Sequence, residues 1–448
     1  MEHQNRLTEG KIGPTLLRFA LPFLLSSFLQ ALYGAVDLFV VGRFADSAAV
    51  SAVAIGSQVM QTLTGIILGL SMGATVLIGR RIGEKDSEGA AKAVGTSTVL
   101  FAVLAAVLTP LMLLFTNQAV SLMETPTAAV EPARGYIFTC SAGLLFIAGY
   151  NAVSGIFRGM GDSRTPVLFI SLACAVNIAG DFLLTGWLGM GAEGAAIATV
   201  AAQAISFFAS LGYMAKKGLA FPVHKSHFRP DGRAIKSILK IGFPLALQDG
   251  LVSISFLVIT AIINTMGLVA SASVGVVERV IGFAMLPPSA FASAVATMTA
   301  QNVGAKRPDR ARKALWFGIG YSLIFGVLVC VYAQFLPETV TSIFTRDSAV
   351  IASAADYFRS YALDCVLVSF VFCMNSYFSG CGNSLVSFLH SMVATFGVRI
   401  PLTYLLSRGA EGNLYPMGLA APAATVVSLI ICLCYLRWEN RRQKQLAL

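Results

Sequence analysis

The sequence predicts an all-α membrane protein whose twelve transmembrane helices form two pseudo-symmetric six-helix lobes around a central cavity. Composition is the first reason: of the 448 residues, 56% are hydrophobic and only 12% are charged, whereas a soluble protein carries about 25% charged residues. Apolar runs long enough to span a bilayer are the second reason, and they recur along the whole chain. The third is an internal repeat at a constant offset. A β-barrel would show short alternating segments instead.

Twelve apolar runs predict the membrane helices, to within a few residues at each end. Pro22 in the first helix and Pro244 in the seventh are candidate hinges, because proline removes a backbone donor and commonly kinks a membrane helix. The predicted spans are 14–41, 51–79, 93–115, 133–157, 166–186, 194–215, 235–265, 270–301, 314–336, 351–379, 384–407 and 416–436.

Lys and Arg are distributed unevenly over the segments that connect these spans. If the N-terminus is inside, 25 of the 32 Lys and Arg residues lie in inner segments and five lie in outer segments. The positive-inside rule therefore predicts that both termini are cytoplasmic. The net charge of +10 is explained by this orientation and by contact with anionic lipid, not by a nucleic-acid-binding surface.

The two halves of the chain repeat one another at an offset of 221. "IGEKDSEGAAKA" (82–93) matches "VGAKRPDRARKA" (303–314), and "GMGDS" (159–163) matches "GCGNS" (380–384). Each half has six predicted helices, an even number, so both halves enter the membrane from the same side. Such halves are related by a pseudo-two-fold axis along the membrane normal, an architecture typical of alternating-access transporters. The alternative is a duplicated scaffold without transport.

The repeat also predicts the domain organisation. Residues 1–215 form an N-lobe with helices 1–6, residues 216–236 form a cytoplasmic inter-lobe loop, and residues 237–448 form a C-lobe with helices 7–12.

Four polar residues fall at similar depth in three predicted helices of the first half: Asp37, Asn177, Asp181 and Thr199. Asn177 and Asp181 share a helix face because residues four apart are neighbours. Two carboxylates, an amide oxygen and a hydroxyl suit a small hard cation such as sodium, and two close carboxylates in a low dielectric can instead hold a proton near neutral pH. Both interpretations describe a coupling-ion site. The alternative is interhelical hydrogen bonding with at least one Asp protonated.

The second half carries a different set of acids, Asp249, Glu278 and Asp364, together with Arg279 and Arg399. Salt bridges between helices are one interpretation. The functional interpretation is that these acids line a cavity and attract cationic substrates.

The sequence lacks the motifs of the enzyme classes that occur in membranes. The chain has no aspartate-rich diphosphate motif, no HExxH zinc motif and no Walker loop. We therefore expect a protein that is not an enzyme and that uses no cofactor. A channel would need a selectivity filter, and no such repeat is evident.

Several passages together resemble the multidrug and toxic compound extrusion (MATE) antiporters over essentially the full length. They are "FALPFLLSSFLQALYGAVDLFVVGRF" (19–44), "GATVLIGRRIGEKD" (73–86), "FRGMGDSRTP" (157–166), "NIAGD" (177–181), "GAAIAT" (194–199) and "AQNVGAKRPDRARKA" (300–314). The resemblance implies two six-helix lobes that form a V around a central cavity. It also implies export of mostly cationic, lipophilic compounds in exchange for protons or sodium.

The resemblance assigns residues as well. The family's N-lobe cation site matches Asp37, Asn177, Asp181 and Thr199, so these four would bind H+ or Na+, and they would be the metal ligands if the ion is Na+. The C-lobe acids vary among branches of the family. Residues that could line the cavity or contact substrate are Tyr33, Asp249, Glu278 and Asp364.

The resulting hypothesis is a monomeric efflux antiporter of the bacterial inner membrane, coupled to H+ or Na+, whose partners are small-molecule substrates and membrane lipids. The alternative is a dedicated exporter or flippase of one metabolite or lipid-linked precursor.

Overall fold

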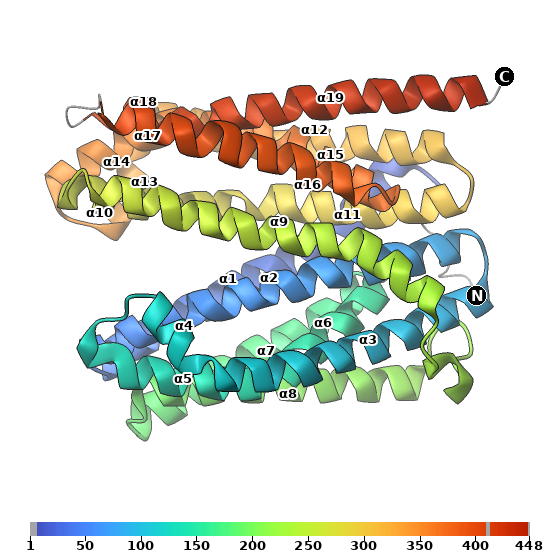
Figure 1. The fold of residues 1–448 in the computed structure, drawn as a ribbon, viewed down its shortest axis with the longest axis horizontal. Helices are drawn as coiled ribbons and strands as arrows, with labels where there is room; N and C mark the ends of the chain where they lie inside the picture. Colours follow the sequence, from blue (N-terminus) through green and yellow to red (C-terminus); the bar gives the residue numbers. More distant parts are fainter. Residues whose placement is uncertain (1–6, 409–412, 447–448) are drawn as a thin grey trace. The chain divides into compact units, whose positions relative to one another are not determined.

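A computed structural model of the chain describes residues 7–408 and 413–446. Over these ranges the regular structure is entirely helical (Figure 1). Eleven helices of the described residues are long and apolar enough to cross a membrane, and the bent pair Thr127–Ala142 and Leu144–Gly159 supplies a twelfth if it counts as one span. The predicted all-α, multi-pass fold is therefore confirmed.

The first half of the chain runs from the N-terminal helix to the polar segment near residue 225. A π-helical segment at Phe182–Trp187 follows α7, and short 3-10 helices lie at Thr127–Ala129 and Lys225–Phe228. The helices are α1 (Ile12–Phe44), α2 (Ser47–Gly83), α3 (Ser87–Leu114), α4 (Thr116–Leu122), α5 (Val130–Ala142), α6 (Leu144–Gly159), α7 (Arg164–Asp181) and α8 (Gly191–Lys217).

The second half repeats this order of long and short elements. A π-helical segment at Thr395–Arg399 follows α16. The helices are α9 (Gly232–Asn264), α10 (Leu268–Ala284), α11 (Leu286–Gly304), α12 (Pro308–Phe335), α13 (Pro337–Phe344), α14 (Ser348–Tyr361), α15 (Leu363–Gly380), α16 (Ser384–Ala394), α17 (Ile400–Arg408), α18 (Tyr415–Gly418) and α19 (Ala420–Leu446).

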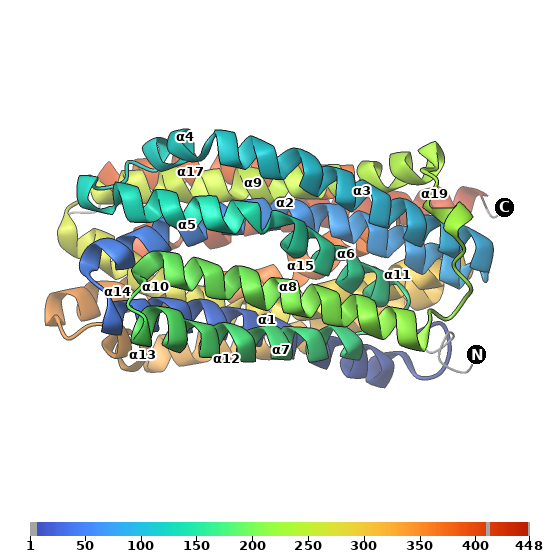
Figure 2. The same cartoon turned by 90° about the horizontal axis from the view of Figure 1, so that it is seen from below.

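The fourth predicted span, 133–157, is not one straight helix. The chain bends by 49° between α5 and α6, and this change of direction is visible in Figure 2. Gly143 lies at the break, where an added Cβ would be 2.6 Å from a methyl group of Val200 on α8. Glycine at this point lets α8 approach closely and is itself a weak helix former. The sequence pattern alone shows apolar residues on both sides and so hides the break.

The structure reproduces the sequence repeat, although one long helix of the first half is divided in the second. Residues 47–83 form α2, and the residues at the same offset, 268–304, form α10 and α11. Lys85 and Lys306, which also differ by 221, are both non-glycine residues with a positive φ, of 58° and 57°. A left-handed residue of this kind is uncommon outside glycine, so its recurrence at the repeat offset indicates that both turns descend from one ancestral turn.

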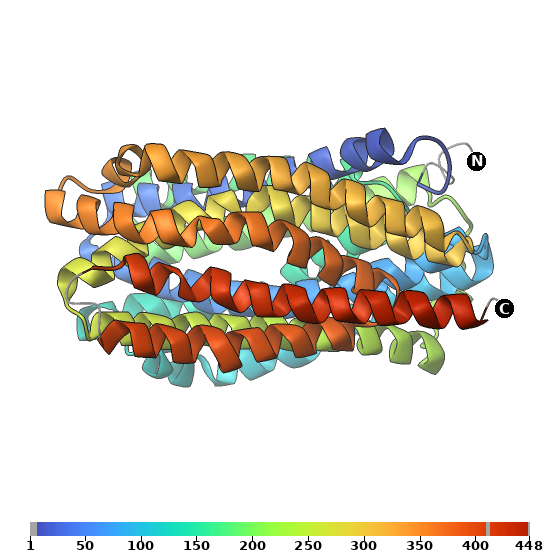
Figure 3. The same cartoon turned by 90° about the horizontal axis from the view of Figure 1, so that it is seen from above.

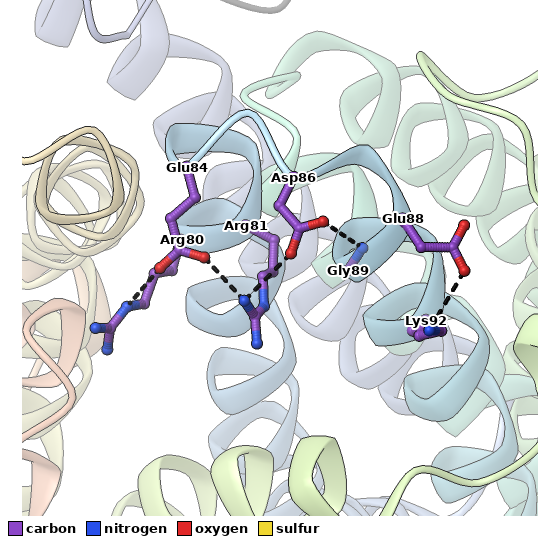
Figure 4. Close-up of polar contacts among 7 residues, drawn as sticks. All are labelled: Arg80, Arg81, Glu84, Asp86, Glu88, Gly89 and Lys92. Atoms are coloured by element: carbon purple, nitrogen blue, oxygen red, sulfur yellow. Dashed lines mark hydrogen bonds and ion pairs between the residues drawn. The ribbon is translucent and has the colours of Figure 1, made fainter.

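Charged side chains contact one another at the turn after α2, as Figure 4 shows. Glu84 contacts Arg80 at 3.2 Å and Arg81 at 2.9 Å, and Arg81 also contacts Asp86 at 3.2 Å. Asp86 caps α3, because its Oδ1 accepts the backbone N–H of Gly89 at 2.8 Å. Exposed ion pairs contribute about 0–1 kcal/mol each, so the cap and the turn geometry set this conformation more than the charges do.

Contacts divide the chain into two compact units. The first contains Leu21–Ala246 and Ala300–Arg307, and the second contains Lys11–Ala20, Leu247–Thr299 and the chain from Pro308 on. Helices α1 and α9 each change unit next to a candidate hinge, Pro22 or Pro244. The lobe boundaries drawn at 215 and 237, and the hinge role of both prolines, stay predictions.

Within each unit, helices pack through small residues. In the first unit α7 lies along α8, and α2 packs against α5 and α6. In the second unit α19 packs along α15 and α16, which Figure 3 shows as red beside orange. Gly159 approaches the Thr75 carbonyl in the first unit, and Gly380 approaches the Ala296 carbonyl in the second, so this contact is repeated at the offset of 221. Close backbone approach is typical of membrane helices, where small residues form the interfaces.

The C-terminal ends of α2 and α11, both in the first unit, meet through a reciprocal pair of glycine contacts. A Cβ added to Gly83 would lie 1.9 Å from the Gln301 carbonyl oxygen, and one added to Gly304 would lie 2.1 Å from the Arg80 carbonyl oxygen. Arg80 and Gly83 correspond to Gln301 and Gly304 at the offset of 221. The two helices therefore contact each other through the same two positions of the repeat. Gln301 adds a hydrogen bond from its amide nitrogen to the Gly159 carbonyl, at 2.9 Å.

Replacing Gly304 with Ala is expected to lower the thermal stability of the purified protein. The added methyl group meets backbone, which cannot move aside as a side chain can, and overpacking of this kind costs about 1–3 kcal/mol. The matched control is Gly320→Ala, where an added Cβ has nothing within 4 Å and where Ala is the better helix former. Thermal melts in detergent should show a lower midpoint for Gly304→Ala only. Equal melting temperatures would contradict the close contact.

Candidate functional site

The four polar residues predicted in the first half come together in the structure. Asp37 lies on α1, Asn177 and Asp181 lie on one face of α7, and Thr199 lies on α8. The Thr199 hydroxyl donates to Asp37 Oδ2 at 3.3 Å, and Asn177 Nδ2 donates to Thr199 Oγ1 at 3.3 Å. Thr199 therefore bridges the other two helices.

Burial is the main physical feature of this site. Asp37, Asn177 and Asp181 are 3%, 1% and 0% exposed. The carboxyl groups of Asp37 and Asp181 are electrostatic neighbours. Among the described residues no N–H or hydroxyl group donates to Asp37 Oδ1, Asn177 Oδ1 or either carboxyl oxygen of Asp181, while the two carboxyl groups are close enough to share a proton. Buried polar atoms are nearly always satisfied, so four unsatisfied oxygens in one place fit a small cation or a proton.

Asp181 ends α7, and the π-helical segment Phe182–Trp187 begins directly after it. Such segments are rare and occur frequently at functional sites, because the extra residue in the turn shifts side chains and frees backbone groups. The sequence gives no signal for this feature.

Two further residues line the first site. Tyr33 lies one turn before Asp37 on α1 and has Gln203 of α8 as its side-chain hydrogen-bonding neighbour. Gln203 is buried, its Oε1 has no partner among the described residues, and it lies four residues after Thr199. That spacing on a predicted helix is the signal through which sequence reasoning could have found it. The structure thus places Tyr33 beside the first-unit site, and Tyr33 is not among the residues that line the cavity of the other three.

The predicted acids of the second half also come together. Asp249 of α9, Glu278 of α10 and Asp364 of α15 line one cavity of about 510 Å³, which lies wholly within the second unit. This volume lies in the range of small-molecule sites. Asp364 is 5% exposed, and its Oδ1 has no hydrogen bond from the described residues. Salt bridges between helices, the alternative interpretation, are not seen: no ion pair of the described residues includes any of these acids.

Polar residues that the sequence analysis did not single out complete the cavity. His390 of α16 is 1% exposed, its Nδ1 is 2.6 Å from Ser428 Oγ on α19, and its Nε2 has no partner in the described part of the chain. Asn375 Oδ1 and Gln248 Oε1 are also buried and unsatisfied. Single polar residues in apolar helices carry no spacing signal, so only the packing of the helices brings them together.

Clusters of His, Cys, Asp and Glu that could hold a metal ion do not occur among the described residues. The first-unit site differs from such a cluster, since only two of its four members are acids. Its oxygen ligands suit an alkali cation and not zinc or iron.

Comparison with known proteins agrees with this architecture. The family profile MatE matches residues 22–183 and 244–405, once in each half. The probable multidrug resistance protein YoeA of Bacillus subtilis (strain 168) is 26% identical, with 97% of each chain aligned. The FAD transporter of Shewanella oneidensis is 23% identical over 84% of this chain and 85% of its own length. A crystal structure of MATE in complex with MaL6 superposes with a TM-score of 0.91 at 22% identity, covering 100% of this chain and 99% of that chain.

The MatE profile matches both copies of the repeat, and YoeA aligns with this chain over nearly the full length of both proteins. This confirms the family resemblance and the prediction that the chain is no enzyme. The chain belongs to the MatE family of membrane transporters.

Proposed function

We propose that this protein is a cation-coupled efflux antiporter that exports lipophilic, mostly cationic compounds by alternating access. The observation that carries the proposal is the first-unit site, where buried oxygens from α1, α7 and α8 converge and four of them have no donor among the described residues. Such groups are costly in a membrane unless they serve an ion. The relative YoeA, named as a probable multidrug resistance protein, supports export of drugs.

The coupling ion is H+ or Na+, and the same residues serve either one. Sodium would be held by the oxygens of Asp37, Asn177, Asp181 and Thr199, whereas a proton would be shared by the two carboxyl groups. In both cases the bound cation cancels one negative charge of the carboxyl pair and weakens the attraction for a cationic substrate, which then leaves. Coupling is reciprocal, so substrate must weaken ion binding by the same factor.

The cavity of the second unit supplies the second part of the proposal. Asp249, Glu278 and Asp364 bring carboxyl groups to a lining in which apolar residues such as Phe256 and Phe372 are mixed with polar ones. An acidic, partly apolar cavity suits lipophilic cations, because it offers both burial and a counter-charge. We propose a monomer in the bacterial inner membrane with both termini cytoplasmic, supported by the uneven distribution of Lys and Arg.

Transport in proteoliposomes tests the proposal. The purified protein is reconstituted, and uptake of a fluorescent cation is followed with a sodium gradient and a proton gradient imposed separately. One gradient should drive uptake against the substrate gradient, and collapsing that gradient with the matching ionophore should stop it. Uptake that neither gradient accelerates would refute cation coupling.

Replacing Thr199 with Val is expected to raise the KM for the coupling ion about tenfold. Val has nearly the shape of Thr but removes the hydroxyl that links Asn177 to Asp37, and a hydrogen bond to a charged group contributes about 1.5–3 kcal/mol. Thr199→Ser is the matched control, because it keeps the hydroxyl, and its KM should remain within about twofold of the wild-type value. Initial transport rates over a range of ion concentrations provide the measurement. The same KM in both variants would argue against a role for the hydroxyl.

A dedicated exporter of one metabolite is a second candidate, and the similarity to an FAD transporter over most of both chains favours it. A flippase for a lipid-linked precursor belongs to the same alternative. A resistance panel of unrelated cationic dyes and drugs, measured in a strain that lacks its own exporters, separates the two functions. Resistance to several of them supports multidrug export, and resistance to none supports the dedicated exporter.

A further inference from the structure

Arg399 stands out in the second-unit cavity, because it is the one Lys or Arg among the described residues that line it. It ends the π-helical segment Thr395–Arg399. The equivalent position of the first half, at the offset of 221, is Ile178. The repeat therefore does not require a charge here, and the arginine belongs to the second half alone.

Two aromatic rings hold the guanidinium group in place. Its Cζ lies 4.4 Å from the centre of the Phe256 ring and 5.9 Å from that of Tyr361. Its Nη2 donates to the Tyr361 hydroxyl at 3.0 Å. Cation–π contacts stabilise a desolvated arginine without using its N–H groups. The side chain is thus fixed and oriented by groups that carry no negative charge.

The remaining N–H groups of Arg399 have no acceptor among the described residues and are free to bind a ligand. A guanidinium has five donors, and Tyr361 is its one hydrogen-bond acceptor among the described residues. Glu278 and Asp364 influence Arg399 electrostatically, but neither comes within ion-pair distance of it in the described part of the chain. Arg399 is half-buried. An arginine close to carboxylates commonly forms a fork with one of them, and here two carboxyl groups share its cavity without doing so.

We propose that Arg399 binds the anionic group of zwitterionic substrates, molecules that carry a cationic amine together with a carboxylate or a phosphate. The fork of N–H groups matches the two oxygens of such an anion. The three acids of the same cavity take the amine. A pure anion is repelled by these acids, so the cavity accepts negative charge only in a molecule that also brings a positive charge.

This inference rests on the proposed export function and adds a class of substrate to it. Arg399 is a specificity-determining residue in this view. If it only balanced the charges of Glu278 and Asp364, its loss would affect every cationic substrate alike. If it contacts the substrate anion, its loss affects only substrates that have one.

A matched pair of dyes separates these two roles. A rhodamine with a free benzoic acid is a zwitterion, and its methyl ester is a cation with the same ring system. The wild-type protein is expected to transport both dyes. Arg399→Gln should lower kcat/KM at least tenfold for the carboxylate dye and change it less than about twofold for the ester. Arg399→Lys should fall between, because lysine keeps the charge but loses the fork.

Arg408→Gln is the control, because it also removes an arginine that contacts an aromatic ring. Arg408 lies 4.4 Å from the Tyr404 ring centre and also hydrogen-bonds its hydroxyl, but it is not among the residues that line this cavity. Both dyes should be transported by this variant at the wild-type rate. Normal transport of the ester by Arg399→Gln shows in addition that this variant folds.

Three results would overturn the inference. One is an equal loss for both dyes in Arg399→Gln, another is no loss for either, and the third is a wild-type protein that transports the ester alone. Fluorescence anisotropy with the purified protein keeps the test independent of transport. There, Arg399→Gln should raise the Kd of the carboxylate dye at least tenfold and leave that of the ester within twofold. Failure of export with this binding difference intact would count against the proposed function and not against Arg399.

Discussion

Replacing Asp37 with Asn is expected to abolish coupled transport, lowering kcat/KM about 100-fold or more. Asn keeps the size of the side chain and its ability to accept the bond from Thr199, but it cannot carry the negative charge that a cation neutralises. Coupling free energies between two ligands amount to about 1–3 kcal/mol, or up to roughly 150-fold. Loss of the charge removes this coupling altogether. Asp181→Asn should act in the same direction, since both carboxyl groups are buried together.

The informative measurement pairs transport with substrate binding. Asp37→Asn should still bind a fluorescent cation, because the acids of the second-unit cavity are untouched, but bound substrate should no longer be displaced by the coupling ion. Asp46→Asn is the matched control: Asp46 caps α2 by accepting the backbone N–H of Ala49 at 2.8 Å, and Asn caps helices equally well. Full coupled transport by Asp37→Asn, with normal ion dependence, would disprove the coupling-ion assignment.

Much of the fold can be predicted from the sequence, because the length of each apolar run is a strong indication of a membrane-spanning helix. A run of apolar residues long enough to span a bilayer has few other stable conformations, so the spans and the repeat are both predictable. The breaks are not. The bend at Gly143 and the two π-helical segments depend on how one helix packs against another. The hydrophobic pattern of a single helix does not predict these packing contacts.

The first-unit site was predictable for a related reason. Asp37, Asn177, Asp181 and Thr199 are polar residues at similar depth in apolar helices, and such residues are too costly to lie toward lipid. The depth of a residue in the membrane can be estimated from its position along the predicted helix. The helix face on which it lies can be inferred in part, because residues four apart share a face. The structure brings these four together, and their role as ligands remains a proposal.

The second-unit cavity was predictable only in part. Its acids could be found, but their surroundings depend on which faces of α9, α10 and α15 turn inward. The sequence equally allowed salt bridges between these acids and Arg399. The structure instead places Arg399 against Phe256 of α9 and Tyr361 of α14, and neither acid comes within ion-pair distance of it among the described residues. Such competition between partners is decided by packing and not by residue type.

Replacing Asp364 with Asn is expected to raise the KM for cationic substrates about 30-fold or more. Asp364 lines the cavity, and its Oδ1 has no donor among the described residues, so this carboxyl oxygen is free to accept a hydrogen bond or an ion pair from a cationic ligand. Removing one partner of a buried charge pair costs about 2–5 kcal/mol, and 2 kcal/mol corresponds to roughly 30-fold. A neutral lipophilic substrate should lose much less, since it gains only apolar contact from this cavity.

Asp356→Asn is the control for this change in the same unit. Asp356 forms a partly exposed ion pair with Arg359 at 3.2 Å and is not among the cavity's lining residues, so the KM should not change. The two acid variants should also differ from each other: Asp37→Asn keeps substrate binding and loses displacement by the ion, whereas Asp364→Asn loses affinity for the cation and keeps its ion dependence. If Asp364→Asn left the KM unchanged for every cation tested, the acidic cavity would have no part in recognition, and the charge that attracts substrate would have to reside at Asp37 and Asp181 themselves. In that case substrate and ion would compete directly for one site.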